Sequence, residues 1–537
     1  MLNQAASVRD EFQSFLLRMA GKYQPFPGLR EREADLRLLA DSLSKPFTLA
    51  VFGRMKTGKS SLINALVGRP LAITGVEEAT ATLNWISYGD KSQEDTVLVH
   101  WKDGRVEPIS FSRLLEWTGK QPEVLARVRD TSFIQLFANA SRLKEVQIVD
   151  TPGTGSVADE HEELAQDLLS QRASEDTAEE GHKADALLYV FSPVAREKDA
   201  AALAEFQKTR LPGSDPYNSI GVLHKWDGLE DDDLVAAAKR KADRLHDVLK
   251  DVVSAVIPVS APLALTARHA PDSYFTGLLE VLSASRDKVR PALKMDSRWD
   301  DDPARKAARA AYPSACLPWV CFVRLVNLLL DRSCESVAEA RKASLEASGI
   351  EQLEAELDRR FFRRAAVIKQ RLTRVKAKEP ITKGLMFFNE RIELLAADSR
   401  HFTDLASRIS TGDPHGEWLR EKTTATEKEH FELEGYAVDA DRDWLVEEER
   451  MNLMEKDLAF LEQMDKTPGF IEPRDHESIV RLLTACDQPD NDEQLPKEVL
   501  MAMISRYQHQ MQGPVKRTRE LFEHLLLSRI QERLLKA

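Results

Sequence analysis

Cysteine is scarce in this sequence of 537 residues. Its four cysteines are Cys316, Cys321, Cys334 and Cys486. They lack the spacing of a metal site and are too few for a disulfide framework, so they favour a protein of the reducing cytosol. The first ten residues also lack the apolar core of a signal peptide. We therefore expect a cytoplasmic protein.

Long apolar runs are missing as well. The longest candidate, Leu317–Leu330, contains Pro318, Arg324 and Asn327. It falls short of the ~18 apolar residues that a membrane-spanning helix needs. A buried helix is the better interpretation of this segment.

Glycine and proline are few, and basic residues are outnumbered. The chain has 23 glycines and 24 prolines, and 75 lysines and arginines stand against 88 acidic residues, a formal net charge of −13. This balance gives no general attraction to nucleic acid, so no nucleic-acid partner is expected. With so little glycine and proline, the second half of the chain favours long helices.

The order of segments predicts an α/β domain between two helical regions. Residues 1–46 have apolar side chains at helical spacing. From residue 47 short β-rich runs alternate with amphipathic segments, which predicts a mostly parallel, doubly wound sheet. The expected strands are Phe47–Phe52, Thr82–Tyr88, Thr96–Trp101, Val146–Val149, Ala186–Phe191, Ser219–Leu223 and Ala255–Val259. Lys102–Arg105 looks like a hairpin turn and predicts an additional antiparallel edge.

No β pattern recurs beyond about residue 296. Prolines, among them Pro380 and Pro414, divide the remainder into expected helices, and one long helix is predicted from about Asp441 to Met464. We therefore predict four parts. They are an N-terminal helical segment (1–46) that packs with the C-terminal bundle, the α/β domain (47–295), a helical neck (296–378), and an extended all-α bundle or stalk with coiled-coil packing (379–537).

The segment Gly53–Ser60 matches the phosphate-loop pattern in full, between an expected strand and an expected helix. Gly53 and Gly58 allow the backbone N–H groups to converge on phosphate oxygens. Lys59 places a cation against the β- and γ-phosphates, and Ser60 offers its hydroxyl to Mg²⁺. The predicted nucleotide contacts from this segment are Gly53, Arg54, Met55, Lys56, Thr57, Gly58, Lys59, Ser60 and Ser61.

A second box, Asp150–Gly153, follows the run Val146–Val149. Asp150 at a strand end can hold Mg²⁺ through water, and the Gly153 N–H can sense the γ-phosphate. Thr80 is the predicted switch threonine that reaches Mg²⁺ and the γ-phosphate, with Thr74 and Thr82 as alternatives. Ser60, Thr80 and Asp150 are thus the expected metal ligands.

The third box determines the base. His224–Asp227 resembles the GTPase pattern Asn/Thr-Lys-x-Asp, and Ser260-Ala261 follows another expected strand. An aspartate at 227 can accept paired hydrogen bonds from guanine N1–H and its 2-amino group, which adenine does not offer, while Lys225 lies along the base. His224 replaces the usual Asn or Thr, which leaves its loop-bracing role open. The ordered boxes predict GTP rather than ATP.

Together, Gly53–Ser60 with the Ser61–Gly68 that follows it, Thr80-Ala81 before Trp85–Gly89, and Asp150–Ser156 carry a family resemblance. The chain resembles a bacterial dynamin-like protein of the dynamin superfamily, specifically from about Leu49 to Ala261. The resemblance implies a large GTPase that converts GTP to GDP and phosphate, dimerises head to head across the nucleotide, and has a bundle and stalk from both chain ends. It also implies membrane action on the inner face of the membrane, higher self-assembly and a homologous companion chain as partners.

Catalysis in this resemblance leaves one question open. Thr154 stands where small GTPases carry a water-positioning glutamine, and Lys56 stands where guanylate-binding relatives carry an arginine finger. We hypothesise that Lys56 stabilises charge on the transferring phosphate. The alternative is that Lys56 only balances phosphate charge or points into solvent. Lys59, Lys56 and Thr80 are therefore the expected catalytic residues.

The target of the protein also stays open at this point. Three apolar segments are possible lipid contacts or, alternatively, buried core: Gly384–Phe388, Phe470-Ile471 and Leu525–Leu527. A GTP-gated protein-interaction switch is the main alternative to membrane remodelling. A ribosome-assembly GTPase would need a basic RNA-binding appendage, which this acidic chain does not obviously supply.

Overall fold

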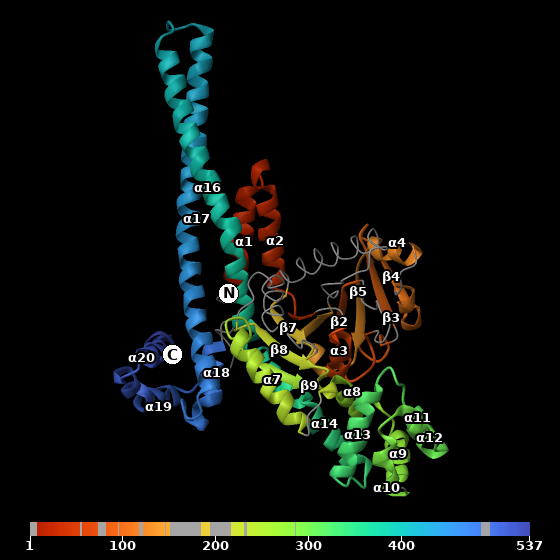
Figure 1. The fold of residues 1–537 in the computed structure, drawn as a ribbon. Coiled ribbons are helices and arrows are strands. Elements are labelled where there is room, and N and C mark those ends of the chain that lie inside the picture. The colour runs from red at the N-terminus through yellow and green to blue at the C-terminus, as the bar shows by residue number, and fades with distance from the viewer. Residues whose placement is uncertain are drawn as a thin grey trace. The chain divides into compact units, whose positions relative to one another are not determined.

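The structure is a computed structural model. It describes residues 8–53, 56–72, 82–94, 96–117, 122–144, 146–150, 184–193, 216–229, 233–284, 286–484 and 495–536. The chain divides into two compact units: Pro46–Arg363, the sheet unit, and Met1–Lys45 with Arg364–Ala537, the helical unit (Figure 1). The division at Arg363 lies within the predicted neck, 296–378.

Within the described residues, the sheet unit holds one sheet of nine strands in the order β4-β3-β5-β2-β6-β1-β7-β8-β9. The strands are β1 (Phe47–Phe52), β2 (Asn84–Tyr88), β3 (Thr96–Trp101), β4 (Val106–Ser110), β5 (Thr131–Ala138), β6 (Val146–Asp150), β7 (Ala186–Phe191), β8 (Ser219–His224) and β9 (Val256–Val259). Strands β6, β1, β7, β8 and β9 are parallel. The hairpin β3–β4 forms an antiparallel edge, and β2 runs antiparallel to β6. The predicted mostly parallel sheet followed by an all-α region is confirmed.

The middle strands are buried along their whole length. Every residue of β1 and of β8 is buried, as expected for parallel strands whose two faces are both covered. The outer strand β4 instead has one buried residue, Ile109. This difference places the buried half of the sheet where the nucleotide boxes begin.

Helices alternate with these strands and then continue beyond β9. They are α3 (Lys59–Val67), α4 (Pro122–Asp130), α7 (Leu234–Leu249), α8 (Ala261–His269), α9 (Asp272–Ala284), α10 (Arg286–Ala292), α11 (Asp296–Asp300), α12 (Pro303–Ala310), α13 (Trp319–Asp331), α14 (Val337–Ser348) and α15 (Ile350–Arg360), with short 3₁₀ turns η3 (Ser141–Lys144), η4 (Trp226–Gly228) and η5 (Phe362–Arg364). Helices α8, α9, α10, α11, α13 and α14 share a second core around Phe275, Trp299 and Phe322. The expected buried helix in Leu317–Leu330 is α13.

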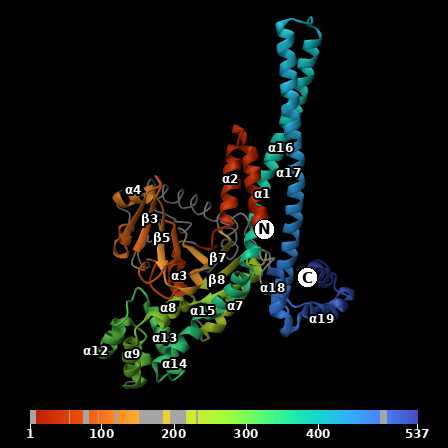
Figure 2. The same cartoon turned by 180° about the vertical axis from the view of Figure 1, so that it is seen from behind.

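The helical unit combines both ends of the chain. Its elements are α1 (Val8–Tyr23), α2 (Arg30–Ser42), α16 (Ala365–Ser407), α17 (Pro414–Lys466), α18 (His476–Thr484), α19 (Lys497–Tyr507), α20 (Lys516–Glu523), a π-helix (His524–Ile530) and α21 (Gln531–Lys536). Figures 1 and 2 show α16 and α17 as a long antiparallel hairpin, with α1 and α2 beside α16. The aromatic rings of Phe15 and Trp444 stack across α1 and α17.

Two helix predictions in this unit are wrong. The long helix begins at Pro414, not near Asp441, because Asp413 caps its first turn through a hydrogen bond from His415 N. Pro380 lies inside α16 and does not end it. A proline removes one helical hydrogen bond, and here packing against α1 and α17 outweighs that loss.

The three apolar segments that were left open between lipid contact and core lie mainly in the core. Phe388 is fully buried and packs edge-on against Tyr23. Ile471 and Leu525 are buried in the core at the C-terminal end of α17. Among the described residues, no helix has both the length and the apolar character needed to cross a membrane.

Candidate nucleotide site

The parallel strands β1 and β6 bring two of the predicted boxes together. Val51 of β1 pairs with Asp150 at the end of β6. The phosphate-loop segment therefore starts beside Asp150 and passes into α3 at Lys59. The N-terminus of α3 and the carboxyl ends of the strands meet at one edge of the sheet, where parallel α/β proteins bind ligands.

Lys59 closes the phosphate loop on itself. Its Nζ donates a hydrogen bond to the Gly53 backbone oxygen over 3.0 Å, and the side chain is 6% exposed. Burial lowers the pKa of Lys59, and the nearby carboxylate of Asp150 opposes that shift. A cation held this way inside a loop of backbone N–H groups is positioned for an anionic ligand.

Ser60 and Asp150 form the candidate magnesium site. Ser60 Oγ donates to Asp150 Oδ2 over 3.0 Å, and Asp150 is fully buried. Its other oxygen, Oδ1, has no hydrogen-bond partner in the described part of the chain. A hydroxyl beside a buried carboxylate is a fitting oxygen donor set for Mg²⁺. Burial raises the pKa of Asp150 to about 6, against the opposing effects of Lys59 and Ser60.

His224 braces the phosphate loop, the role that the sequence left open. Its Nδ1 lies 2.9 Å from the Thr57 backbone oxygen, and its ring is 1% exposed. Gly58 has φ +98°, and a Cβ at that position would fall 2.3 Å from His224 Nδ1. The imidazole thus fills the space that a glycine at 58 leaves open.

Lys225 provides a second tie to the loop. Its Nζ donates to the Lys56 backbone oxygen over 2.5 Å. Lys56 and Lys225 are both non-glycine residues with positive φ, 62° and 60°. Strained backbone of this kind concentrates at ligand-binding loops, which agrees with the predicted position of the nucleotide.

The residues predicted to read the base lie at the ends of β8 and β9. Asp227 is 6% exposed and accepts a hydrogen bond on Oδ1 from Arg324 Nη1 over 3.1 Å. Ser260 donates its N–H to the Ser348 backbone oxygen over 2.8 Å, while its Oγ has no partner among the described residues. Ala261 opens α8, as Ser61 lies in the first turn of α3.

Four of the predicted residues lie outside the described residues: Arg54, Met55, Thr80 and Gly153. Thr82, an alternative to Thr80, is described and is buried just before β2. Asp150, His224 and Lys225 contact the phosphate-loop residues directly. The sequence did not predict a role for Arg324 at this site. The available signal was its position as a lone arginine within the apolar run Leu317–Leu330. A charge buried in such a helix needs a partner.

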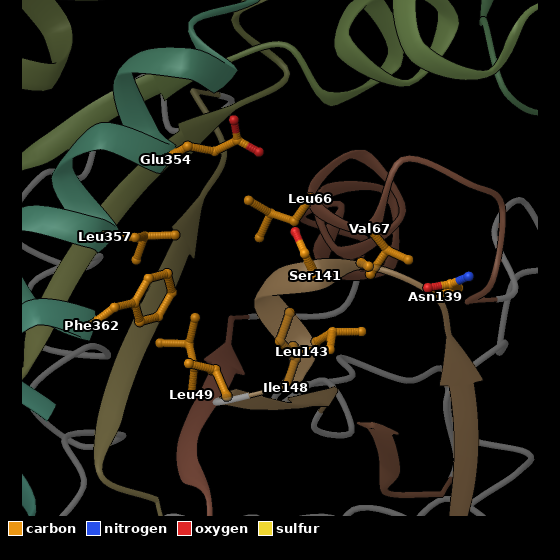
Figure 3. A pocket seen from close by; sticks show the side chains of 12 residues that line it. Leu49, Leu66, Val67, Asn139, Ser141, Leu143, Ile148, Glu354, Leu357 and Phe362 are labelled. Atoms are coloured by element: carbon orange, nitrogen blue, oxygen red, sulfur yellow. The ribbon is translucent and has the colours of Figure 1, made fainter. Parts of the chain in front are cut away.

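A cavity of about 350 Å³ lies at the other end of α3, away from the phosphate loop. Figure 3 shows Leu49 and Ile148 facing Leu357 and Phe362 across it. Glu354, on its rim, accepts two hydrogen bonds of 2.8 Å from Arg268. Arg268 also donates to the Ala65 backbone oxygen in the last turns of α3. This cavity is therefore apart from the nucleotide site but shares its helix.

Comparisons with known proteins agree with this geometry. Residues 49–225 match the model of the dynamin family. The isoniazid-induced protein IniC of Mycobacterium tuberculosis is 29% identical over 296 residues, which cover 53% of this chain and 57% of IniC. Dynamin-like protein 2 of Campylobacter jejuni is 31% identical over 121 residues, 22% of this chain and 19% of that protein. The chain thus spans about half the length, or less, of these curated relatives.

A solved structure of an oligomerised bacterial dynamin pair aligns over 99% of this chain and 92% of its own, with 16% identity and a TM-score of 0.34. The family match itself covers the phosphate loop, Asp150 and the start of the guanine box. Residues 49–225 of the chain therefore match the dynamin family, and bacterial dynamin-like proteins are among its relatives.

Proposed function

We propose that this protein binds GTP and hydrolyses it to GDP and phosphate, and that hydrolysis is linked to dimerisation of the sheet unit. The observation that carries the proposal is the meeting of Lys59, Ser60, Asp150 and His224 at one edge of the sheet, with direct contacts between the boxes. The match of residues 49–225 to the dynamin family supports the same reaction.

Each residue has a defined role in this proposal. Lys59 exchanges the Gly53 carbonyl for phosphate oxygens when the nucleotide enters, and His224 holds the loop through Thr57. Asp227 accepts the paired donors of guanine. Ser60 and Asp150 would hold Mg²⁺, which would neutralise phosphate charge. Lys56 has an exposed side chain and is proposed to stabilise the charge that develops on the transferring phosphate.

The cellular role proposed first is dynamin-like action on a membrane from its cytoplasmic face. Dimers across the nucleotide, higher assemblies of this chain or a homologous companion chain would carry it out. One observation favours the alternative, a GTP-gated protein-interaction switch. Within the described residues, the segments considered for lipid contact place Phe388, Ile471 and Leu525 in the core.

The test is GTP turnover as a function of protein concentration, with and without anionic liposomes. Wild type is compared with Lys59→Ala and with Lys250→Ala, an exposed lysine after α7. The proposal expects specific activity that rises with protein concentration, is abolished by Lys59→Ala and is unchanged by Lys250→Ala. Stimulation by liposomes supports membrane action, and stimulation by a protein partner alone supports the switch. Equal turnover by wild type and Lys59→Ala contradicts the GTPase proposal.

A further inference from the structure

Asp227, the proposed reader of guanine, already holds a cation. Arg324 of α13 donates from Nη1 to Asp227 Oδ1 over 3.1 Å, and its guanidinium carbon lies 3.4 Å from the centre of the Trp226 ring. Its Nη2 donates to the Ala347 backbone oxygen over 3.2 Å. Arg324 is therefore held on three sides, by a carboxylate, an aromatic ring and the end of α14.

This ion pair shields the Asp227 carboxylate from solvent. The Asp227 side chain is 2% exposed and the Arg324 side chain 8% exposed. Asp227 Oδ2 is buried without a hydrogen-bond partner in the described part of the chain. Burial and the nearby Asp227 carboxylate raise the pKa of the Cys321 thiol well above its usual value. A base cannot reach Asp227 in this arrangement of α13.

Arg324 and guanine offer the same chemistry to this carboxylate. The N1–H and 2-amino groups of guanine are attached to one carbon and form a planar guanidine-like edge, as the guanidinium of arginine does. Both place planar N–H donors against a carboxylate, and both stack on flat rings. Since adenine lacks this donor pair, only guanine competes with Arg324 for Asp227 on equal chemical terms.

We propose that Arg324 is an internal occupant of the guanine-reading carboxylate, and that a guanine nucleotide is admitted only when α13 releases Asp227. The inference rests on the proposed function, because it assigns a regulatory contact to the same site. The apparent affinity for GTP is then lowered in proportion to the fraction of molecules with the pair closed.

The surroundings give Arg324 somewhere to move. A groove of about 680 Å³ is lined by Asp227 and Arg324 and by Leu234 and Val235 of α7. Arg324 also holds Ala347, whose neighbour Ser348 accepts the hydrogen bond of the Ser260 N–H. Release of Arg324 therefore loosens the second base-reading loop at the same time.

The experiment measures the dissociation constants of fluorescent GDP and GTP analogues for the full chain. Arg324→Met removes the donors but keeps an apolar stem to pack on Trp226, and Arg324→Ala removes both. The matched control is Arg341→Ala, because Arg341 also stacks on a ring, of Phe275, and pairs with a carboxylate, of Asp272, but lies away from Asp227.

We expect about tenfold tighter binding for Arg324→Met, the change that follows if roughly nine in ten wild-type molecules are closed. Affinity for ATP analogues should stay unchanged, and Arg341→Ala should bind as wild type does. Circular dichroism melting identifies the variants that fold. If Arg324→Ala does not fold, the affinities of Arg324→Met alone decide the test. Unchanged or weaker guanine binding by a folded Arg324→Met overturns this inference while leaving the proposed function intact. Absence of guanine binding by wild type and all variants overturns both.

Discussion

The imidazole of His224 and the backbone oxygen of Thr57 are 2.9 Å apart, and that contact joins the guanine box to the phosphate loop. Because the acceptor is a carbonyl, Nδ1 must carry the hydrogen. Nε2 is buried and has no partner among the described residues. The ring is therefore neutral, and burial lowers the pKa of His224 to about 4.

The first prediction concerns pH. In the unfolded chain, His224 binds a proton below its ordinary pKa of 6.5. In the folded chain, His224 stays neutral down to about pH 4. His224 therefore contributes a loss of stability of about 2 kcal/mol between pH 7 and pH 5. Protonation of Asp150, whose pKa is raised to about 6, partly offsets this loss in the wild-type chain. Denaturant unfolding of the full chain at both pH values measures the loss.

His224→Asn is the matched variant for this measurement. An asparagine amide can donate to the Thr57 oxygen but does not titrate, so the loss of stability between pH 7 and pH 5 should be smaller by that amount. If wild type and His224→Asn lose the same stability between the two pH values, the histidine does not carry the effect.

The second prediction concerns Asp227 and base choice. In Asp227→Asn, the amide offers one donor and one acceptor in place of two acceptors. Xanthine carries a carbonyl where guanine has its 2-amino group, so the variant should weaken GTP binding and strengthen XTP binding. Each mismatched hydrogen bond costs about 1–3 kcal/mol, or roughly fivefold to 160-fold in affinity. Competition between the two nucleotides gives the ratio, and an unchanged ratio would place base reading elsewhere.

The third prediction concerns Lys56. Its left-handed backbone and exposed side chain hold the ammonium group outside the buried part of the loop. Lys56→Ala should lower kcat by about a hundredfold at high protein concentration, with little change in KM. Lys56→Arg should retain most of the activity. Unchanged GTP binding together with unchanged stimulated turnover in Lys56→Ala rejects a catalytic role.

The fourth prediction concerns the base of α3. Arg268→Ala removes two hydrogen bonds from the buried Glu354 and one from the Ala65 carbonyl. The free energy of unfolding should fall by about 3 kcal/mol, because a buried charge loses its partner. Urea unfolding measures it. The surface pair Arg290–Asp331 is the control, since both side chains are more than half exposed and Arg290→Ala should cost about 0.5 kcal/mol or less. If Arg268→Ala and Arg290→Ala lower the free energy of unfolding equally, the buried pair is no more stabilising than the surface pair.

The sequence predicted the site best where the functional residues are contiguous in the chain. The phosphate loop needs glycines, a lysine and a hydroxyl in a fixed order, because backbone and side chains act on the same phosphates. Most strand positions could also be predicted, since buried parallel strands appear in the sequence as mainly apolar runs. β5 was not predicted, although Ile134, Leu136 and Ala138 alternate as buried residues along it.

Contacts between distant segments could not be read in the same way. Arg324 and Asp227 are 97 positions apart, and no local pattern specifies their pairing. The bracing by His224 depends on the space at Gly58, which is a property of packing. Helix limits were the weakest predictions. The N-cap at Asp413, a local signal, starts α17 earlier than expected, and tertiary packing keeps Pro380 inside α16. The roles of the nucleotide residues themselves stay predictions until the variants above are measured.

The division of the helical unit between both ends of the chain has a consequence for biosynthesis. Trp444 leaves the ribosome about 430 residues after its stacking partner Phe15, roughly 20–90 s later at translation rates of about 5–20 residues per second. During that interval the sheet unit, one continuous stretch from Pro46 to Arg363, is complete and free to fold. Until α16 and α17 are synthesised, the apolar face of α1 lacks their packing. We therefore expect chaperones to bind this helix in the nascent chain.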